Sequence, residues 1–264
     1  MKTIYHFSGA GNDFVVIDGR EGDVSAFREV PRIEALCQEY KTDGLMILGS
    51  GDAEVDFTME FYNPDGSGGM MCGNGGRCIV AFADYLGIRP SSGGVFLFMA
   101  PDGLHTGEIL ERPADDLWTV RIKMIDVQGI TPMLGGYFLN TGTRHFVKFV
   151  DDVEQVDVDT EGKALRWNEA FAPIGTNVNF VHVAPDGLHV RTFEKGVEGE
   201  TLACGTGLTA CALVAHHAGV PTATPGAYRL RARQDWLSVN FTPGADEKFT
   251  DVYLTGPARL VAIF

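Results

Sequence analysis

Two cysteines in matching sequence surroundings are the residues of this chain most suited to chemistry. They open the segments Cys72-Gly73-Asn74-Gly75 and Cys204-Gly205-Thr206-Gly207, which are 132 positions apart (204 − 72 = 132). Phe61 and Phe193 also precede their cysteines by the same eleven residues (72 − 61 = 204 − 193 = 11). The chain is therefore predicted to be a duplication that keeps one thiol in each copy.

A cysteine at the start of a helix lies at the positive end of the helix dipole, which favours the thiolate over the thiol. The glycines after each cysteine leave the first backbone N–H groups of the helix uncovered, and such donors bind a carboxylate. If both helix starts face one site, one thiolate removes a proton from a carbon while the opposite thiol returns one. The motif thus predicts Cys72 and Cys204 as the base and acid of a reaction that inverts a carbon centre.

The alternative for these two cysteines is ordinary burial or a structural disulfide. Cys37, Cys78 and Cys211 lack the glycine context and are interpreted as small core residues. Five cysteines in 264 residues do not form a disulfide framework, and their spacings do not fit a zinc knuckle. We therefore expect no metal.

The composition limits the partners. The formal net charge is −14 (21 − 35), which argues against a nucleic acid or an anionic membrane as partner. We see neither a signal-peptide core nor an apolar run of membrane-spanning length, so a cytoplasmic location is expected.

The elements that must position the cysteines are mostly strands. Predicted strands are 13–18, 45–48, 55–62, 95–99, 118–122, 146–150, 178–183, 188–193 and 237–241. Predicted helices are 31–40, 75–86, 164–171 and 207–218. The helix after Cys204 is apolar on nearly every side, which predicts that a curled sheet encloses it. We expect an α+β fold of two pseudo-symmetric lobes, each a curled, mostly antiparallel sheet around a central helix, with a junction near 112–116.

The hexapeptide Ala-Pro-Asp-Gly-Leu-His occurs at 100–105 and again at 184–189. The two copies are 84 positions apart (184 − 100 = 84), so they do not belong to the 132-residue register. We interpret them as the same hairpin turn used twice.

Several further motifs follow one another along the chain. They are Gly9–Phe14, Asp43–Leu45, Tyr62–Gly66, Cys72–Arg77, Gly175–Phe180, Phe193–Gly196, Glu200–Gly207 and Leu254–Ala258. In order and spacing, from end to end, they resemble diaminopimelate epimerase. Together they are a specific signature, although any one of them alone is weak.

The resemblance implies a cofactor-independent enzyme, usually a homodimer, that interconverts LL- and meso-diaminopimelate on the way to lysine and peptidoglycan. It implies that Cys72 and Cys204 exchange roles as acid and base, and that His145 and Glu194 bias their pKa values. The implied substrate-binding residues are Asn12, Asn63, Gly73, Asn74, Asn177, Glu194, Lys195, Gly205 and Thr206, with Gly44, Thr143 and Arg144 as further candidates. It also implies that residues 253–264 return to the first lobe, so that the lobes are 1–113 with 253–264, and 114–252.

Two departures from the family pattern bear on the substrate. Lys195 stands where the family commonly has arginine, and lysine cannot grip a carboxylate through two parallel hydrogen bonds. Thr143-Arg144 stands where the family commonly has Asn-Pro, so a substrate-facing asparagine is replaced and a guanidinium appears beside it. Arg144 either compensates for Lys195 or is a solvated strand residue.

Three alternatives stand beside diaminopimelate epimerase, and the departures favour the first of them. The first is a racemase with the same two thiols that acts on another amino acid, such as histidine or proline. The second is a catalytically silent ligand-binding relative, and phenazine-pathway isomerases lie between the two. A pyridoxal enzyme is the third, but the sequence carries no decisive mark of its lysine and phosphate site. Facing thiols are also expected to be prone to oxidation, with loss of activity in air and recovery with reductant.

Overall fold

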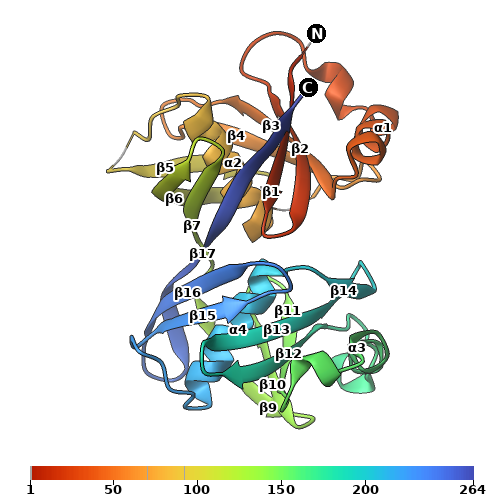
Figure 1. Cartoon of the computed structure of the whole chain (residues 1–264), viewed down its shortest axis with the longest axis vertical. Helices are drawn as coiled ribbons and strands as arrows, with labels where there is room; N and C mark the ends of the chain where they lie inside the picture. The colour runs from red at the N-terminus through yellow and green to blue at the C-terminus, as the bar shows by residue number, and fades with distance from the viewer. Residues whose placement is uncertain (1, 70, 92) are drawn as a thin grey trace. The chain divides into compact units, whose positions relative to one another are not determined.

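The computed structural model describes residues 2–69, 71–91 and 93–264; the expectations for Met1, Met70 and Ser92 lie outside them. The chain divides into two compact units, Met1–Ile122 with Gly256–Phe264, and Lys123–Thr255 (Figure 1). Within the described ranges, no helix is long and apolar enough to cross a membrane.

Unit 1 is a closed sheet around a buried helix. Its strands are β1 (Ile4–Gly9), β2 (Asn12–Asp18), β3 (Gly44–Ser50), β4 (Phe57–Tyr62), β5 (Val95–Ala100), β6 (Gly103–Ala114), β7 (Leu117–Lys123) and the end of β17 (Lys248–Ile263). Its helices are η1 (Ser25–Arg28), α1 (Val30–Tyr40) and α2 (Gly73–Tyr85). Each strand pairs with the next, and β17 pairs with both β7 and β1, which closes the ring. The enclosed α2 is buried from Gly73 to Ala83, whereas α1 packs on the outer face.

Unit 2 repeats this plan. Its strands are β8 (Val127–Gln128), β9 (Thr131–Met133), β10 (Gly136–Asn140), β11 (Arg144–Phe149), β12 (Asn177–Ala184), β13 (Gly187–Glu194), β14 (Gly199–Thr201), β15 (Ala227–Arg231), β16 (Trp236–Pro243) and the start of β17. Its helices are η2 (Val153–Gln155), α3 (Val158–Arg166), η3 (Glu169–Phe171) and α4 (Gly205–His217). The ring runs from β9 through β10, β11, β12, β13, β15 and β16 to β17, which pairs with β8. As Figure 1 shows, α4 lies among these strands as α2 does in unit 1.

The two units share their pattern of parallel pairs. In unit 1, β2 is parallel to β3 and β4 to β5. In unit 2, β11 is parallel to β12 and β13 to β15. The remaining neighbours in both rings are antiparallel. The predicted α+β class, with two pseudo-symmetric lobes and a central helix in each, is confirmed.

Two predicted boundaries differ from the structure. The structural division falls after Ile122 instead of near Pro113, because residues 103–114 are the long strand β6, which pairs with β7 within unit 1. The helix predicted at 164–171 instead spans Val158–Arg166, since the Asp157 carboxylate accepts a hydrogen bond from the Thr160 N–H (3.1 Å) and caps an earlier start.

The sequence register of the duplication does not hold upstream of the cysteines. Phe61 contacts the Phe14 ring and lies on the face of β4 opposite Tyr62, which packs against the α1 cluster. Phe193 belongs to the cluster on the α3 side of its own strand. The two phenylalanines thus lie on opposite faces, because a slip of one residue moves a side chain to the other face of a strand.

The two copies of the hexapeptide form equivalent hairpins, as predicted. Gly103 pairs with Ala100 at the β5–β6 turn, and Gly187 pairs with Ala184 at the β12–β13 turn. Both glycines have positive φ angles, of 129° and 145°. The shared sequence therefore reflects shared turn chemistry.

Candidate active site

Cys72 is the N-cap residue of α2. The Gly75 N–H donates to its sulfur at 3.2 Å, so one of the unpaired backbone donors of the first turn already faces the thiol. The Cys72 side chain is half-buried. A backbone donor at a helix start favours the thiolate form.

Arg77 is fully buried one turn into α2 and organises the residues after Cys72. Its guanidinium donates to the Gly73 carbonyl (3.2 Å), to Asn74 Oδ1 (2.9 Å) and to the Pro257 carbonyl at the end of β17 (3.3 Å). Because Asn74 Oδ1 accepts from Arg77, its Nδ2 is directed to Asn12 Oδ1, to which it donates. The structure thus brings the predicted residues Asn12, Gly73 and Asn74 together beside Cys72.

The strand β3 supports this cluster from the side. The Asp43 carboxylate, just before β3, accepts from Asn12 Nδ2 at 3.2 Å and from the Asp13 N–H at 2.9 Å. A Cβ atom at Gly44 would lie 2.8 Å from the Tyr62 carbonyl, so close approach of β3 and β4 requires glycine there. Gly44 is therefore explained by backbone packing next to Asn12.

The candidate Asn63 lies in the turn that follows β4. Its side-chain nitrogen donates to Ser67 Oγ at 3.0 Å, and its backbone N–H donates to the Ser67 carbonyl at 2.9 Å. An isolated bridge between Tyr62 and Gly68 extends this turn antiparallel to β4. The Asn63 side chain is engaged within its own turn.

Cys204 is the N-cap residue of α4 and is 7% exposed. Its sulfur lies 3.5 Å from Thr206 Oγ1. Thr206 Oγ1 lies 2.9 Å from His145 Nε2 and 3.2 Å from Thr143 Oγ1, and Thr143 Oγ1 is itself 2.9 Å from His145 Nε2. The Thr206 carbonyl accepts from Thr141 Oγ1 at 2.9 Å. The predicted residues Thr143, His145 and Thr206 therefore meet at the start of α4.

Burial makes His145 a neutral imidazole. Its side chain is fully buried, and desolvation of the charged form lowers its pKa from 6.5 to about 3. The histidine is therefore a neutral hydrogen-bonding partner of Thr206 and Thr143.

The Asn177 side chain links the backbones of Arg144 and Lys195. Asn177 Nδ2 donates to the Arg144 carbonyl at 2.9 Å, and Asn177 Oδ1 accepts from the Lys195 N–H at 2.8 Å. The Arg144 guanidinium turns to the other face of β11, where it lies 5.1 Å from the Phe138 ring centre. Arg144 thus points away from His145. Glu194 ends β13 and is half-buried.

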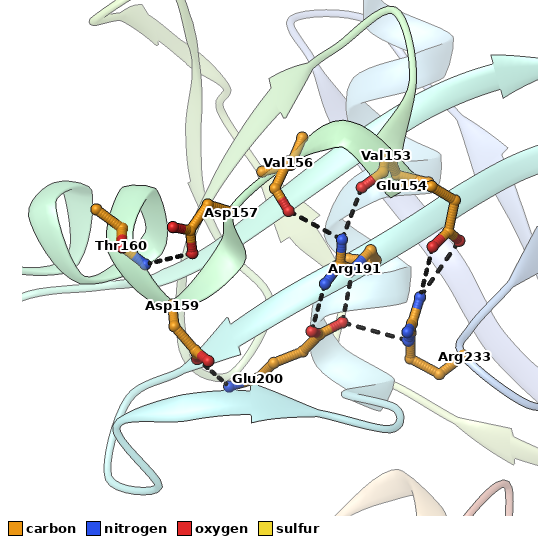
Figure 2. Close-up of polar contacts among 9 residues, drawn as sticks. All are labelled: Val153, Glu154, Val156, Asp157, Asp159, Thr160, Arg191, Glu200 and Arg233. Carbon is orange, nitrogen blue, oxygen red and sulfur yellow. Dashed lines mark hydrogen bonds and ion pairs between the residues drawn. The ribbon is translucent and has the colours of Figure 1, made fainter.

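An ion-pair network holds the segment that leads to Cys204, as Figure 2 shows. Arg191 binds the Glu200 carboxylate through two hydrogen bonds (2.7 and 2.6 Å) and donates to the Val153 and Val156 carbonyls (2.8 and 3.0 Å). Arg233 Nε lies 3.4 Å from Glu200 as well. This bidentate geometry fixes β14 on β13 four residues before Cys204 (204 − 200 = 4).

Sequence reasoning missed three residues of these clusters. Arg77 and Asn179 were parts of motifs without a role of their own, and Thr192 was not considered. Asn179 was detectable in principle, because Asn177 and Asn179 lie on one face of a mostly apolar strand. Thr192 carried no comparable signal.

Comparison with known proteins identifies the family of the chain that carries these two clusters. The profile of the family described as diaminopimelate epimerase matches residues 4–92 and 137–261. The diaminopimelate epimerase of Chlorobaculum tepidum is 40% identical over 96% of this chain and 97% of its own. The chain belongs to the diaminopimelate epimerase family. Membership makes it an isomerase of the epimerase class.

A second relative supports this family assignment, and two solved structures allow a comparison of the fold. The diaminopimelate epimerase of Flavobacterium psychrophilum is 37% identical over 98% of this chain and 97% of its own. Among solved structures, a Bacillus anthracis phenazine biosynthesis protein aligns with a TM-score of 0.77 at 11% identity, over 100% of this chain and 98% of its own. A hydroxyproline epimerase from Agrobacterium vitis aligns with a TM-score of 0.66 at 15% identity, over 100% and 91%. These two structures share the fold.

Proposed function

We propose that this enzyme interconverts LL- and meso-diaminopimelate without a cofactor, with Cys72 and Cys204 as the two bases. The observation that carries the proposal is that each cysteine caps a buried helix at the same point of a duplicated closed sheet, in a member of this epimerase family. In one direction a thiolate takes the α-proton and becomes a thiol, and the opposite thiol donates its proton to the other face and becomes a thiolate. The roles exchange in reverse.

The α-carboxylate of the substrate takes up negative charge as the proton leaves. We infer that backbone N–H groups at the starts of α2 and α4 stabilise this charge, because fixed donors stabilise developing charge without reorganising. Asn74 and Thr206 occupy the second position after each cysteine and would contact the reacting amino-acid group. Asn12, Asn63, Asn177, Glu194 and Lys195 would bind the distal one.

The product would supply lysine and peptidoglycan synthesis in the cytoplasm, and the active form would be a homodimer. A second candidate keeps the chemistry and changes the amino acid. It is favoured by Lys195 and Thr143, which replace the family's common arginine and asparagine, and by Arg144, which turns away from His145. All three changes leave both thiols in place, although Thr143 itself lies in the cluster at the start of α4.

The test is proton NMR of the reduced enzyme in D₂O with LL-diaminopimelate and then with a panel of other amino acids. We expect loss of the α-proton signal with formation of meso product, abolished in Cys72→Ala and in Cys204→Ala. Cys211→Ala is the matched control, because Cys211 is a buried cysteine of the same helix as Cys204. Exchange only with another amino acid would favour the second candidate, and no exchange at all would overturn both.

Facing thiols also predict a chemical signature. Mild oxidation should join Cys72 to Cys204 in a disulfide, detected by peptide mass spectrometry, with loss of activity and recovery on reduction. Full activity after oxidation would contradict the facing arrangement.

A further inference from the structure

A chain of polar side chains leads from the wall of unit 2 to Cys204. Thr192 Oγ1 donates to Asn179 Oδ1 at 3.0 Å, and Asn179 Nδ2 lies 3.1 Å from His145 Nδ1. On the other side of the ring, His145 Nε2 lies 2.9 Å from Thr206 Oγ1, which is 3.5 Å from Cys204 Sγ. Asn179 and His145 are fully buried, Thr192 is 3% exposed and Thr206 is half-buried, so the bonds from Thr192 to His145 are made within the protein.

The orientation of the Asn179 amide is fixed by its neighbours. Its Nδ2 lies 3.1 Å from the Phe146 carbonyl, which can only accept a hydrogen bond. The amide nitrogen must therefore face this carbonyl, since the flipped amide would place two acceptors together. One N–H of Asn179 goes to Phe146, and the second is directed at His145 Nδ1.

This orientation sets the tautomer of the histidine. Because Asn179 donates to Nδ1, that nitrogen is the bare acceptor of the neutral ring, and the ring proton is on Nε2. Nε2–H then donates to the Thr206 or Thr143 hydroxyl. With the opposite tautomer, one of these hydroxyl protons would have to turn towards the ring.

We propose that Asn179 is a positioning residue that holds His145 as the Nε2–H tautomer and so leaves the Thr206 hydroxyl to donate to Cys204. This inference rests on the proposed role of Cys204 as acid and base. A hydroxyl proton directed at the sulfur stabilises the thiolate. Gly207 supports the assignment, because a Cβ atom there would collide with Asn179 Oδ1, so the first turn of α4 packs directly on this amide.

The first test reads the tautomer itself. In protein labelled with ¹⁵N-histidine, long-range proton–nitrogen correlation distinguishes a bare ring nitrogen from a protonated one, and His145→Gln assigns the signal. We expect His145 Nδ1 to be bare and Nε2 to carry the proton in the wild type. A protonated Nδ1, or an average of the two tautomers, would overturn the proposal without reference to activity.

The second test reads the thiol. We would compare the alkylation rates of Cys204 and Cys72 by iodoacetamide, measured by peptide mass spectrometry in the same sample. Asn179→Leu should slow Cys204 by roughly threefold to tenfold, as expected for the loss of one neutral hydrogen bond, and leave Cys72 unchanged. Thr192→Val is the matched control, because it removes the bond on the far side of Asn179 and should keep both the tautomer and the Cys204 rate.

Equal slowing in Asn179→Leu and Thr192→Val, or equal slowing of both cysteines, would show general loosening and overturn the positioning role. Both readouts are independent of substrate. A correct tautomer in an enzyme inactive on diaminopimelate would therefore refute only the proposed function. The wrong tautomer in an active epimerase would refute only this inference.

Discussion

The walls that face the two central helices differ in chemistry although the two units share one topology. In unit 1, Met46 pairs with Phe61, and the Met46 sulfur would lie 3.4 Å from a Cβ atom at Gly75 of α2. In unit 2, Asn179 pairs with Thr192, and Asn179 approaches Gly207 of α4 in the same way. An apolar wall thus stands behind Cys72, whereas a hydrogen-bonded polar wall stands behind Cys204.

The difference shows two surroundings for a cysteine at the start of a central helix. At Cys72 the sulfur accepts from the Gly75 N–H, a donor that the helix itself fixes. At Cys204 the Thr206 hydroxyl lies 3.5 Å from the sulfur and 2.9 Å from His145 Nε2, and we infer that the histidine sets the direction of the hydroxyl proton. A hydroxyl can rotate and a backbone amide cannot, so on this inference the polar wall orients the hydroxyl beside Cys204.

The largest loss of activity should come from replacing either cysteine. Cys72→Ser and Cys204→Ser should each lower kcat/KM by roughly 100-fold to 10,000-fold, because each removes one proton-transfer group from a two-base reaction. Rates would be measured in both directions with LL- and meso-diaminopimelate. Near-normal turnover in one of the two variants would contradict the two-base proposal, since the cysteine replaced in that variant would then have no part in proton transfer.

The buried His145 should make the free energy of unfolding depend on pH. The folded protein keeps His145 neutral down to its pKa of about 3, whereas the unfolded chain takes up a proton below about pH 6.5. The wild type should therefore lose about 1.4 kcal/mol of unfolding free energy per pH unit between these values through this group alone.

His145→Gln removes this contribution, so the difference in unfolding free energy between wild type and variant should narrow as the pH falls from 6.5 towards 3. Urea unfolding at a series of pH values measures it. Parallel curves for wild type and His145→Gln would show that His145 is not held neutral.

Substitutions of Arg77 and Thr209 test how the first turns of α2 and α4 are held. They share the 132-residue register (209 − 77 = 132), and each side chain donates to the carbonyl of the first glycine of its helix. Arg77→Met should cost about 3 kcal/mol of unfolding free energy, because Asn74 and two carbonyls lose a buried donor, whereas Thr209→Val should cost about 1 kcal/mol. Equal losses in denaturant titrations would mean that Arg77 does not organise the start of α2.

Alanine at the second glycine of each motif should lower the free energy of unfolding by different amounts in the two helices, and Gly75→Ala should have the smallest effect. At Gly207 a Cβ atom would collide with Asn179 Oδ1, and Gly207→Ala should cost roughly 1 to 3 kcal/mol. At Gly75 the nearest atoms are 3.3 and 3.4 Å away, so Gly75→Ala should cost less than about 1 kcal/mol. The reverse order in thermal or urea unfolding would contradict the close contact between α4 and the polar wall.

The sequence was informative where a pattern is local. The duplicated motif predicted both N-cap cysteines, and the apolar run after Cys204 predicted an enclosed helix. It was misleading where pairing across strands matters, since the equal spacing of Phe61 and Phe193 suggested equivalence for residues on opposite faces. The pairing of Asn179 with Thr192 and the burial of His145 depend on strand register, which a linear spacing does not encode.

The most direct test of the two-base claim is the position of deuterium early in the reaction. LL-diaminopimelate would be converted to a few per cent in D₂O, and product and remaining substrate would be analysed by NMR and mass spectrometry. Two thiols on opposite faces predict one deuterium at the inverted α-carbon of the meso product and none in the remaining LL substrate. Deuterium in the remaining substrate, or the substrate's own proton carried into the product, would contradict the account.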